Sequence, residues 1–113
     1  VWQDARIRGV EFRAAGNEPG WYLEVDSTGR GVLVTAYGAE RHVFPRVRRE
    51  GEPLARLTGE ESGRRLTARI DSESCFDAMS GESYPLSVTV DHDGQQLRGC
   101  GAVLQPLAVP GTP

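Results

Sequence analysis

The chain has 113 residues, which is enough for one domain of ordinary size and too few for two. Charged residues make up 26% of it and apolar residues 38%, a composition that excludes a disordered protein. The net charge of −3 argues against a nucleic-acid-binding domain, and no stretch approaches the ~20 apolar residues of a transmembrane segment.

The start of the chain predicts a lead-in segment followed by short strands. Because Gly occurs 14 times and Pro 7 times, we expect frequent turns and no long helix. Residues 1–10 are the lead-in, either an added edge strand or a segment packed on the surface, and residues 11–14 form a short strand. Pro19 and Gly20 suit the centre of a type II turn, with Gly20 at positive φ. The strand at residues 21–26 then alternates apolar and polar side chains.

The middle of the chain continues with two strands and a loop. Residues 32–37 predict a strand that is apolar on both faces. Residues 42–47 predict an edge strand or a bulge, because Pro45 cannot donate a ladder hydrogen bond. The charged segment 48–53 contains Gly and Pro, and we expect it to be a solvated loop.

The second half predicts two further hairpins. Residues 54–58 and 66–70 flank a Gly-bounded turn at 59–63. Residues 84–92 and 95–104 flank Asp93-Gly94, the strongest hairpin signal of the chain, which favours a two-residue type I′ turn.

These elements amount to about eight short strands with no convincing helix. The pattern is typical of an all-β barrel or sandwich, and we expect a small antiparallel β-barrel over residues 11–104. An irregular tail follows at 105–113. Residues 71–85 are the one long segment without strand periodicity, and a short helical turn fits at 75–79. The alternating apolar residues predict the interior: Trp21, Leu23, Val25, Leu66, Ile70, Val88 and Val90.

The two cysteines, Cys75 and Cys100, leave two interpretations open. In a small extracytoplasmic domain two cysteines most often form one disulfide. That bond would close a loop of about 26 residues and stabilise the fold by roughly 3.5 kcal/mol. In a cytosolic protein they would be buried free thiols. No metal site is expected, because the scattered His42 and His92 lack ligand spacing with the cysteines.

Residues suited to catalysis are few, and we expect neither an enzyme nor a cofactor. His42 and His92 are interpreted as partly exposed structural residues. Ser80 lacks the Gly-x-Ser-x-Gly pattern of a nucleophile elbow. Glu18 and Asp77 could pair as acid and base, but the sequence does not give their separation, and Asp77 equally suits a turn cap.

All 13 basic residues are arginine. A GC-rich genome accounts for this first, because lysine, asparagine and isoleucine have AT-rich codons and Asn17 is the only asparagine. Recognition of phosphate by arginine is the alternative.

Two segments stand out from the strand pattern, at 16–21 and at 75–85. Their structural interpretation is a tight turn before a buried tryptophan and a long loop held by the disulfide. Their functional interpretation is a recognition surface, because loops on a rigid scaffold commonly carry binding. The first segment consists of Gly16, Asn17, Glu18, Pro19, Gly20 and Trp21, and the contacts of the second would be Phe76, Asp77, Met79, Ser80, Glu82 and Tyr84.

The chain also carries a spaced combination of motifs: Phe12-Arg13-Ala14, the segment 16–21, Cys75-x-Asp77-x-Met79-Ser80-Gly81, Tyr84-Pro85 and Leu97-Arg98-Gly99-Cys100-Gly101. Over residues 11–104 this combination resembles a family of small bacterial envelope proteins, most of them described as uncharacterised proteins or lipoproteins. The resemblance implies export to the periplasm or the cell exterior and a disulfide between Cys75 and Cys100. It also implies a lipid-anchored precursor in many members, although a lipobox cysteine is not among these residues.

Small envelope β-barrels include inhibitors of lysozyme and related peptidoglycan hydrolases, an analogy of architecture only. We therefore expect a non-enzymatic envelope binding domain. Its partner would be another envelope protein, such as a cell-wall hydrolase that it inhibits or confers immunity against, or a small ligand in the barrel mouth. The alternatives are a structural or stress-related envelope lipoprotein without a discrete ligand, and a hydrolase that uses Glu18 and Asp77.

Overall fold

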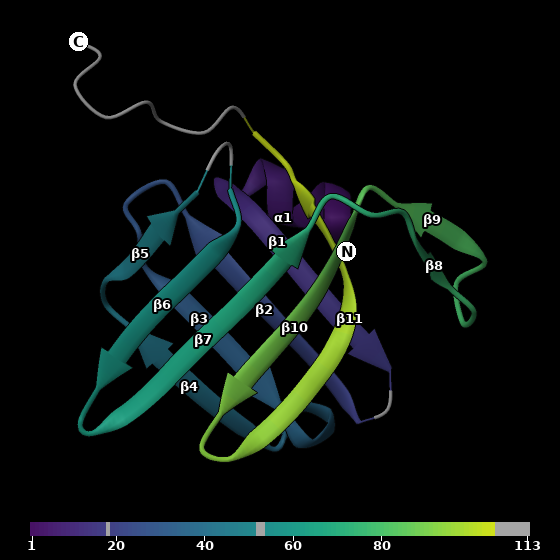
Figure 1. Cartoon of the computed structure of the whole chain (residues 1–113). Coiled ribbons are helices and arrows are strands. Elements are labelled where there is room, and N and C mark those ends of the chain that lie inside the picture. Colours follow the sequence, from purple (N-terminus) through teal and green to yellow (C-terminus); the bar gives the residue numbers. More distant parts are fainter. Residues whose placement is uncertain (18, 52–53, 106–113) are drawn as a thin grey trace, which may run out of the picture.

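A computed structural model describes residues 1–17, 19–51 and 54–105. Nine antiparallel strands form one sheet in the order β4-β3-β2-β1-β11-β10-β7-β6-β5, which curls into a nearly closed barrel (Figure 1). The predicted all-β antiparallel barrel is confirmed, with nine strands in place of about eight. The elements are α1 (Trp2–Ile7), β1 (Val10–Asn17), β2 (Gly20–Asp26), β3 (Gly31–Thr35), η1 (Ala36–Gly38), β4 (Glu40–Phe44), β5 (Val47–Glu50), β6 (Arg56–Glu61), β7 (Arg64–Asp71), β8 (Cys75–Asp77), β9 (Glu82–Tyr84), β10 (Leu86–His92) and β11 (Gln95–Val103).

The two edges of the sheet, β4 and β5, are adjacent in sequence. Strand β4 ends at Phe44, and β5 begins at Val47 on the other side of the barrel seam. Pro45 lies between them and lacks the N–H that would continue a ladder, which fits a strand end. Of the two alternatives for the strand predicted at 42–47, the edge strand is confirmed, but it ends at Phe44, and Val47 already belongs to β5.

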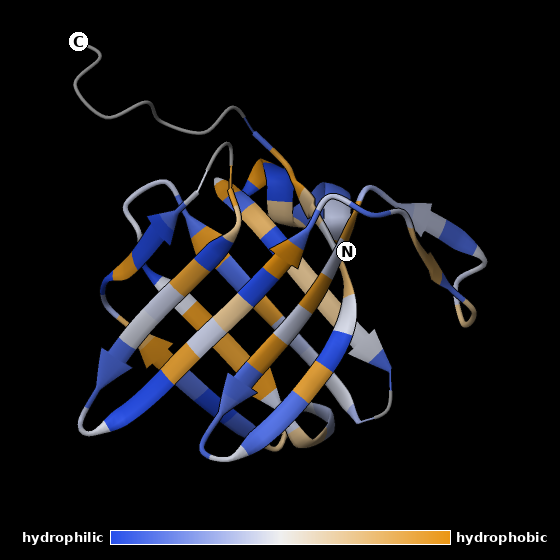
Figure 2. Cartoon of the chain, viewed as in Figure 1, coloured by the Kyte–Doolittle hydropathy of each residue, from blue (hydrophilic) through white to orange (hydrophobic). Residues whose placement is uncertain are grey.

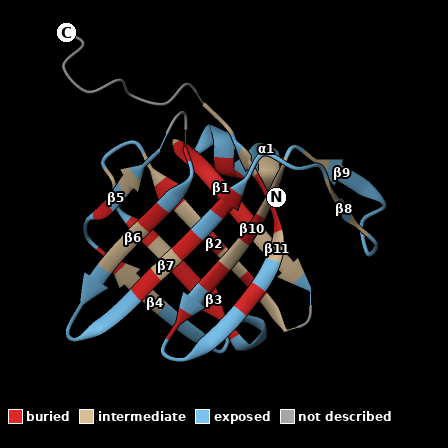
Figure 3. Ribbon diagram, viewed as in Figure 1, coloured by how far each residue is buried: buried red, intermediate tan, exposed pale blue. Residues whose placement is uncertain are grey.

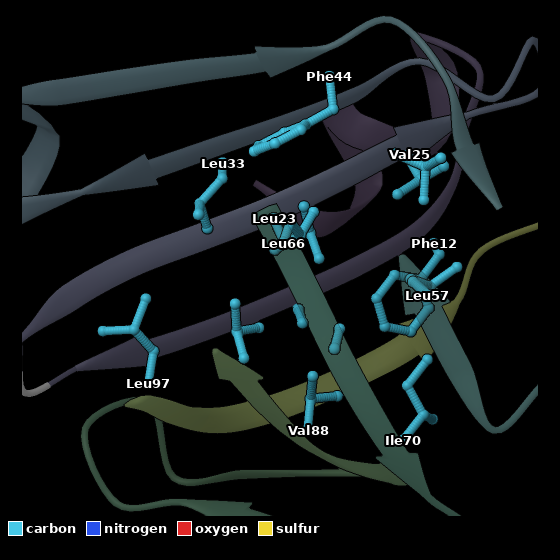
Figure 4. Packing of buried hydrophobic residues seen from close by; sticks show 14 of the residues in the cluster. Phe12, Leu23, Val25, Leu33, Phe44, Leu57, Leu66, Ile70, Val88 and Leu97 are labelled. Carbon is cyan, nitrogen blue, oxygen red and sulfur yellow. The ribbon is translucent and has the colours of Figure 1, made fainter. Parts of the chain in front are cut away.

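The core is the inner face of the barrel. Apolar and polar residues alternate along the strands (Figure 2), and the apolar positions are the buried ones (Figure 3). Side chains from opposite walls, such as Leu33 and Leu66, meet in the interior (Figure 4). All seven residues predicted to lie inside are buried.

The lead-in segment is a short helix that packs on β1, so the alternative of an added edge strand and the expectation of no helix are wrong, whereas the alternative of a segment packed on the surface fits. Helix α1 buries Ala5, and Nε of Arg8 bonds Oδ2 of Asp4 at 2.9 Å. Gly9 follows with a φ of 90°, a conformation that glycine adopts without steric cost and that ends the helix. A six-residue helix shows too little periodicity to be distinguished from a strand in the sequence.

Two segments predicted as irregular contain strands. Residues 47–50 form β5 in place of the expected loop, because Val47 faces the core while charged neighbours make the segment look solvated. Residues 75–77 form β8, which pairs with β9, so the helical turn expected at 75–79 is wrong. The strand expected at 11–14 is longer and spans the whole of β1.

The hairpin turns follow their backbone chemistry. Asp93 and Gly94 both have positive φ, at 47° and 78°, as the predicted type I′ turn requires. Gly20 lies in β2 opposite Asn17, outside the left-handed region, so its predicted role at a positive φ is wrong. The tail predicted at 105–113 lies outside the described residues beyond Gln105.

Candidate functional site

The hairpin β8–β9 projects from one side of the barrel (Figure 1). A disulfide between Cys75 and Cys100 joins its first strand to β11, as predicted. At its base the hydroxyl of Ser87 donates a hydrogen bond of 3.1 Å to the carbonyl oxygen of Glu73. The hairpin therefore has a fixed base on the barrel wall, although it is not part of the main sheet.

The two segments that stand out in the sequence meet at this hairpin. The side-chain amide of Asn17 donates a hydrogen bond of 2.6 Å to Oδ1 of Asp77. The same carboxylate oxygen accepts the backbone N–H of Met79 at 2.9 Å, and the carbonyl of Asp77 accepts that of Gly81 at 2.8 Å. The hydrogen bond from Asn17 is the main reason that the pKa of Asp77 is lowered. Asp77 is thus an ionised turn cap rather than a proton donor at neutral pH.

Two apolar side chains of the hairpin, Phe76 on β8 and Met79 in the turn after it, face solvent, and these two residues are called its tip here. Phe76 is 65% exposed and Met79 77% exposed, two of the largest exposed apolar groups in the described residues. Neither side chain fills the barrel, so they do not close its end. Ser80 and Glu82 lie beside them, and the Ser80 hydroxyl accepts the backbone N–H of Glu82 at 3.3 Å.

Tyr84 lies at the base of the hairpin rather than at its tip. Its ring stacks on Trp2 of α1, with ring centroids 4.6 Å apart. The guanidinium of Arg13 lies over two aromatic rings, 4.7 Å from the centroid of the Trp2 ring and 5.1 Å from that of the Tyr22 ring. Burial raises the pKa of the Tyr84 phenol, whose O–H donates to Glu82 at 3.2 Å. Tyr84 therefore joins the hairpin to the helix.

A shallow cavity of about 370 Å³ separates the hairpin from the barrel wall. The hairpin contributes Phe76 and Asp77, the end of β1 contributes Asn17, and β11 contributes Arg98. Five of its described lining residues have polar side chains, and Asp77 is the one carboxylate among them.

Trp21 and the glycines near it have structural roles. The indole N–H of Trp21 donates a hydrogen bond of 3.1 Å to the carbonyl oxygen of Arg98, across β1. A Cβ at Gly16 would collide with that indole and with the same carbonyl, and one at Gly99 with the backbone of Ala15. These glycines permit the close approach of β1 and β11. Glu18 lies outside the described residues, and Pro19 occupies the turn before β2.

Sequence reasoning missed Tyr37, which is 75% exposed. Ala36 and Tyr37 both have positive φ, at 52° and 55°, which is uncommon for residues with a side chain. The Tyr37 ring covers Gly20, where a Cβ would lie 2.7 Å from Cδ1. The exposed Tyr37 ring therefore lies against the start of β2, where Gly20 is the cross-strand partner of Asn17.

The two histidines, scattered in the sequence, are neighbours in the barrel. Their ring centroids are 4.5 Å apart, because β4 and β10 meet across the interior. His42 is partly exposed as expected, but His92 is only 4% exposed, so its interpretation as partly exposed is wrong. His42 lines a different cavity from Asp77, with Phe44 and Arg64, and the two do not share a pocket.

The described residues hold no group of three His, Cys, Asp or Glu side chains suited to bind a metal ion. Within the same residues, no helix has the length and apolar character needed to cross a membrane.

Comparisons with protein-family models, with curated proteins and with solved structures give no significant match.

Proposed function

We propose that the chain is a non-enzymatic binding domain of the bacterial envelope, which recognises a protein partner with the tip of the β8–β9 hairpin. One observation carries this proposal. Phe76 on β8 and Met79 in the turn that follows are both exposed on a hairpin whose base is covalently fixed. Soluble domains seldom place large apolar groups on a projecting element unless these groups contact something.

The physical properties of the tip suit recognition. Phenylalanine and methionine are enriched in the buried centres of protein interfaces, and methionine adapts its shape to its neighbour. The disulfide and the Asn17–Asp77 hydrogen bond order the hairpin before binding. The free-energy cost of ordering the loop on binding is therefore smaller than it would be for a mobile loop.

The compartment is part of the same proposal. A disulfide persists in oxidising compartments and is uncommon in the cytosol, which supports a periplasmic or extracellular location. The resemblance of the motifs to small envelope proteins supports the same location, with a lipid-anchored precursor.

For the partner we propose a cell-wall hydrolase that the domain inhibits or confers immunity against. A narrow projecting hairpin with an apolar tip is convex, and it suits the concave substrate cleft of an enzyme. Asp77 and Glu82 beside the tip add carboxylates that a polar cleft could bind.

The test measures inhibition of a panel of purified peptidoglycan hydrolases, from lysozymes to lytic transglycosylases, in a cell-wall lysis assay. The tip variant Phe76→Ala/Met79→Ala is compared with Ile7→Ala, which shortens a residue that is 80% exposed on α1. We expect one hydrolase class to be inhibited, with affinity reduced at least about tenfold in the tip variant and unchanged in Ile7→Ala. Thermal unfolding should be the same for all three proteins. Failure of every hydrolase to bind, or equal affinity of the tip variant, would contradict the proposal.

A further inference from the structure

A second concave surface lies on the outer face of β5, β6 and β7, on the side of the barrel away from the hairpin (Figure 1). It is a groove of about 540 Å³ with one acidic residue in its lining, Glu60. The remaining lining residues are Arg46, Arg48, Arg56, Thr58, Gly59, Arg65 and Thr67.

The groove follows from the register of the strands. Arg48 is the cross-strand partner of Thr58, and Thr58 is that of Thr67, so one row crosses the three strands. The two threonines are short and partly buried, whereas the arginines around them are long and exposed. The result is a floor that carries two hydroxyl groups and a rim that carries guanidinium groups.

Within the part of the chain that the structure describes, the charges of this groove are neutralised only in part, since Glu50 lies opposite Arg56 and Glu60 pairs with Arg65. Arg65 forms an ion pair of 3.3 Å with Glu60. Within the described residues, by contrast, Arg46, Arg48 and Arg56 form no ion pair. The chain as a whole has a net charge of −3, so a local excess of positive charge runs against its composition.

Stability accounts for the arrangement only in part. Arg56 has the opposite charge of Glu50 as its cross-strand partner on β5, but on β7 its partner is Arg69, and like charges directly opposite one another destabilise a sheet. GC-rich codon usage explains why the basic residues are arginine, but it does not explain why several of them gather on three neighbouring strands. Local features that weaken a fold are expected where function requires them.

We propose that this groove is an anion-binding site for a ligand with two adjacent phosphate groups. A single carboxylate is satisfied by one guanidinium, whereas a diphosphate offers many acceptor oxygens and several negative charges. Three guanidinium groups and two hydroxyl donors match the larger anion, and the volume is in the range of small-ligand sites. The diphosphate belongs either to a soluble molecule or to the headgroup of a lipid.

The first experiment measures binding of inorganic pyrophosphate by calorimetry, with sulfate and succinate as comparison anions. The groove variant is Arg48→Gln/Arg56→Gln. The control is Arg30→Gln/Arg41→Gln, which removes the same charge from the β2–β4 face beside Glu24 and Asp26. We expect pyrophosphate to bind the wild-type protein more tightly than sulfate or succinate. The affinity should fall at least about tenfold in the groove variant and less than about twofold in the control.

Thr58→Val/Thr67→Val tests the hydroxyl floor with the charges intact. We expect this variant to lose affinity for pyrophosphate, since the two methyl groups cannot donate hydrogen bonds. No pyrophosphate binding by the wild type, equal binding of sulfate, or equal losses in the groove and control variants would overturn the proposal. Unchanged thermal unfolding of each variant shows that the protein is folded.

The second arm identifies the source of the ligand. Vesicles of phosphatidylcholine with a lipid that carries a diphosphate headgroup are compared with phosphatidylcholine alone, with and without competing pyrophosphate. Competed binding to the first vesicles assigns the site to the lipid, and pyrophosphate binding without vesicle binding assigns it to a soluble molecule. The tip variant Phe76→Ala/Met79→Ala should bind pyrophosphate like the wild type. The experiment therefore tests this proposal independently of the proposed function.

Discussion

The amide of Asn17 and the carboxylate of Asp77, 60 residues apart in sequence, share a hydrogen bond of 2.6 Å. Asn17 ends β1, and Asp77 ends the first strand of the projecting hairpin. The contact therefore joins the barrel to the hairpin at a point distant along the chain from the disulfide partner Cys100. Two attachments on different strands restrict rotation of the hairpin, which one attachment alone would permit.

Replacing Asn17 by Ala should loosen the hairpin without unfolding the barrel. Asp77 would lose its side-chain donor, while the cap to the backbone N–H of Met79 remains. We expect faster amide hydrogen exchange at residues 76–79 and unchanged exchange in β7 and β10. Ser83→Ala, on the exposed side of the same hairpin, is the control. Equal exchange in wild type and Asn17→Ala would show that the disulfide alone orders the hairpin.

Removing the disulfide should lower stability but retain the barrel. The double change Cys75→Ser/Cys100→Ser opens a loop with a sequence separation of 25, and we expect a loss of roughly 2–4 kcal/mol in the free energy of unfolding. Strand β11 keeps its pairing with β1 and β10, so the far-ultraviolet circular dichroism should not change. Thiol titration of the denatured, unreduced wild type should find no free thiol. Two free thiols there would contradict both the bond and the proposed location.

Trp21 should be among the most costly core residues to truncate. It is 4% exposed, and its indole N–H satisfies the carbonyl of Arg98. Trp21→Ala removes both the packing and the donor, and we expect a loss of about 3–5 kcal/mol in urea unfolding. Trp21→Phe, which keeps much of the volume without the donor, should lose less. A loss below about 1 kcal/mol for the alanine variant would mean that the side chain lies at the surface.

The local features of the fold could be predicted from the sequence, and the non-local ones could not. Alternation placed Leu23, Val25 and Val88 inside, because strand side chains point to opposite faces with a period of two. The turn at Asp93-Gly94 depends on its own two residues. The proximity of His42 and His92 depends instead on closure of nine strands, and no spacing in the sequence encodes it.

The same distinction applies to the candidate sites, whose local features could be predicted and whose contacts between distant segments could not. The apolar residues of the 75–85 segment stand out because they lack strand periodicity, but the packing of Tyr84 on Trp2 joins two segments that no local pattern relates. The sequence does not predict the arginine groove, because its local patterns place Arg48 in a loop and Arg56 in a separate strand. Register across β5, β6 and β7 was needed to place them on one face.

Replacing Arg69 by Thr should stabilise the protein slightly. The change removes the like charge opposite Arg56, leaves Glu50 opposite Arg56 on β5, and introduces a residue with high strand propensity. We expect the free energy of unfolding to rise by about 0.2–1 kcal/mol, and more at low salt than at high salt. Arg41→Thr, whose cross-strand partner is the uncharged Val34, is the matched control. A gain of the same size in the control would reflect strand propensity rather than charge.

His42 should make stability depend on pH below neutrality. Burial lowers the pKa of its imidazole from the ordinary value of 6.5, and the charges of His92 and Arg64 add to the effect. Arg64 lies close, with Nη1 3.1 Å from Nδ1 of His42. The unfolded chain then binds more protons than the folded protein, so the free energy of unfolding falls as pH drops below about 6.5.

The contribution of His42 is measured by comparing His42→Gln with the wild type in urea unfolding between pH 7.5 and 5. Glu24 and Asp26 also have lowered pKa values, since hydrogen bonds from Arg8 and Arg13 to Glu24, and from Thr28 to Asp26, outweigh the effect of burial. Their contributions are lost only as the pH falls below the ordinary carboxyl range, so they do not account for a loss of stability between pH 7.5 and 5. The variant should lose less stability than the wild type over the window, and the ring protons of His42 should titrate with a midpoint below 6.5. Equal pH slopes would show that the folded protein accepts the proton on His42 as readily as the unfolded chain does.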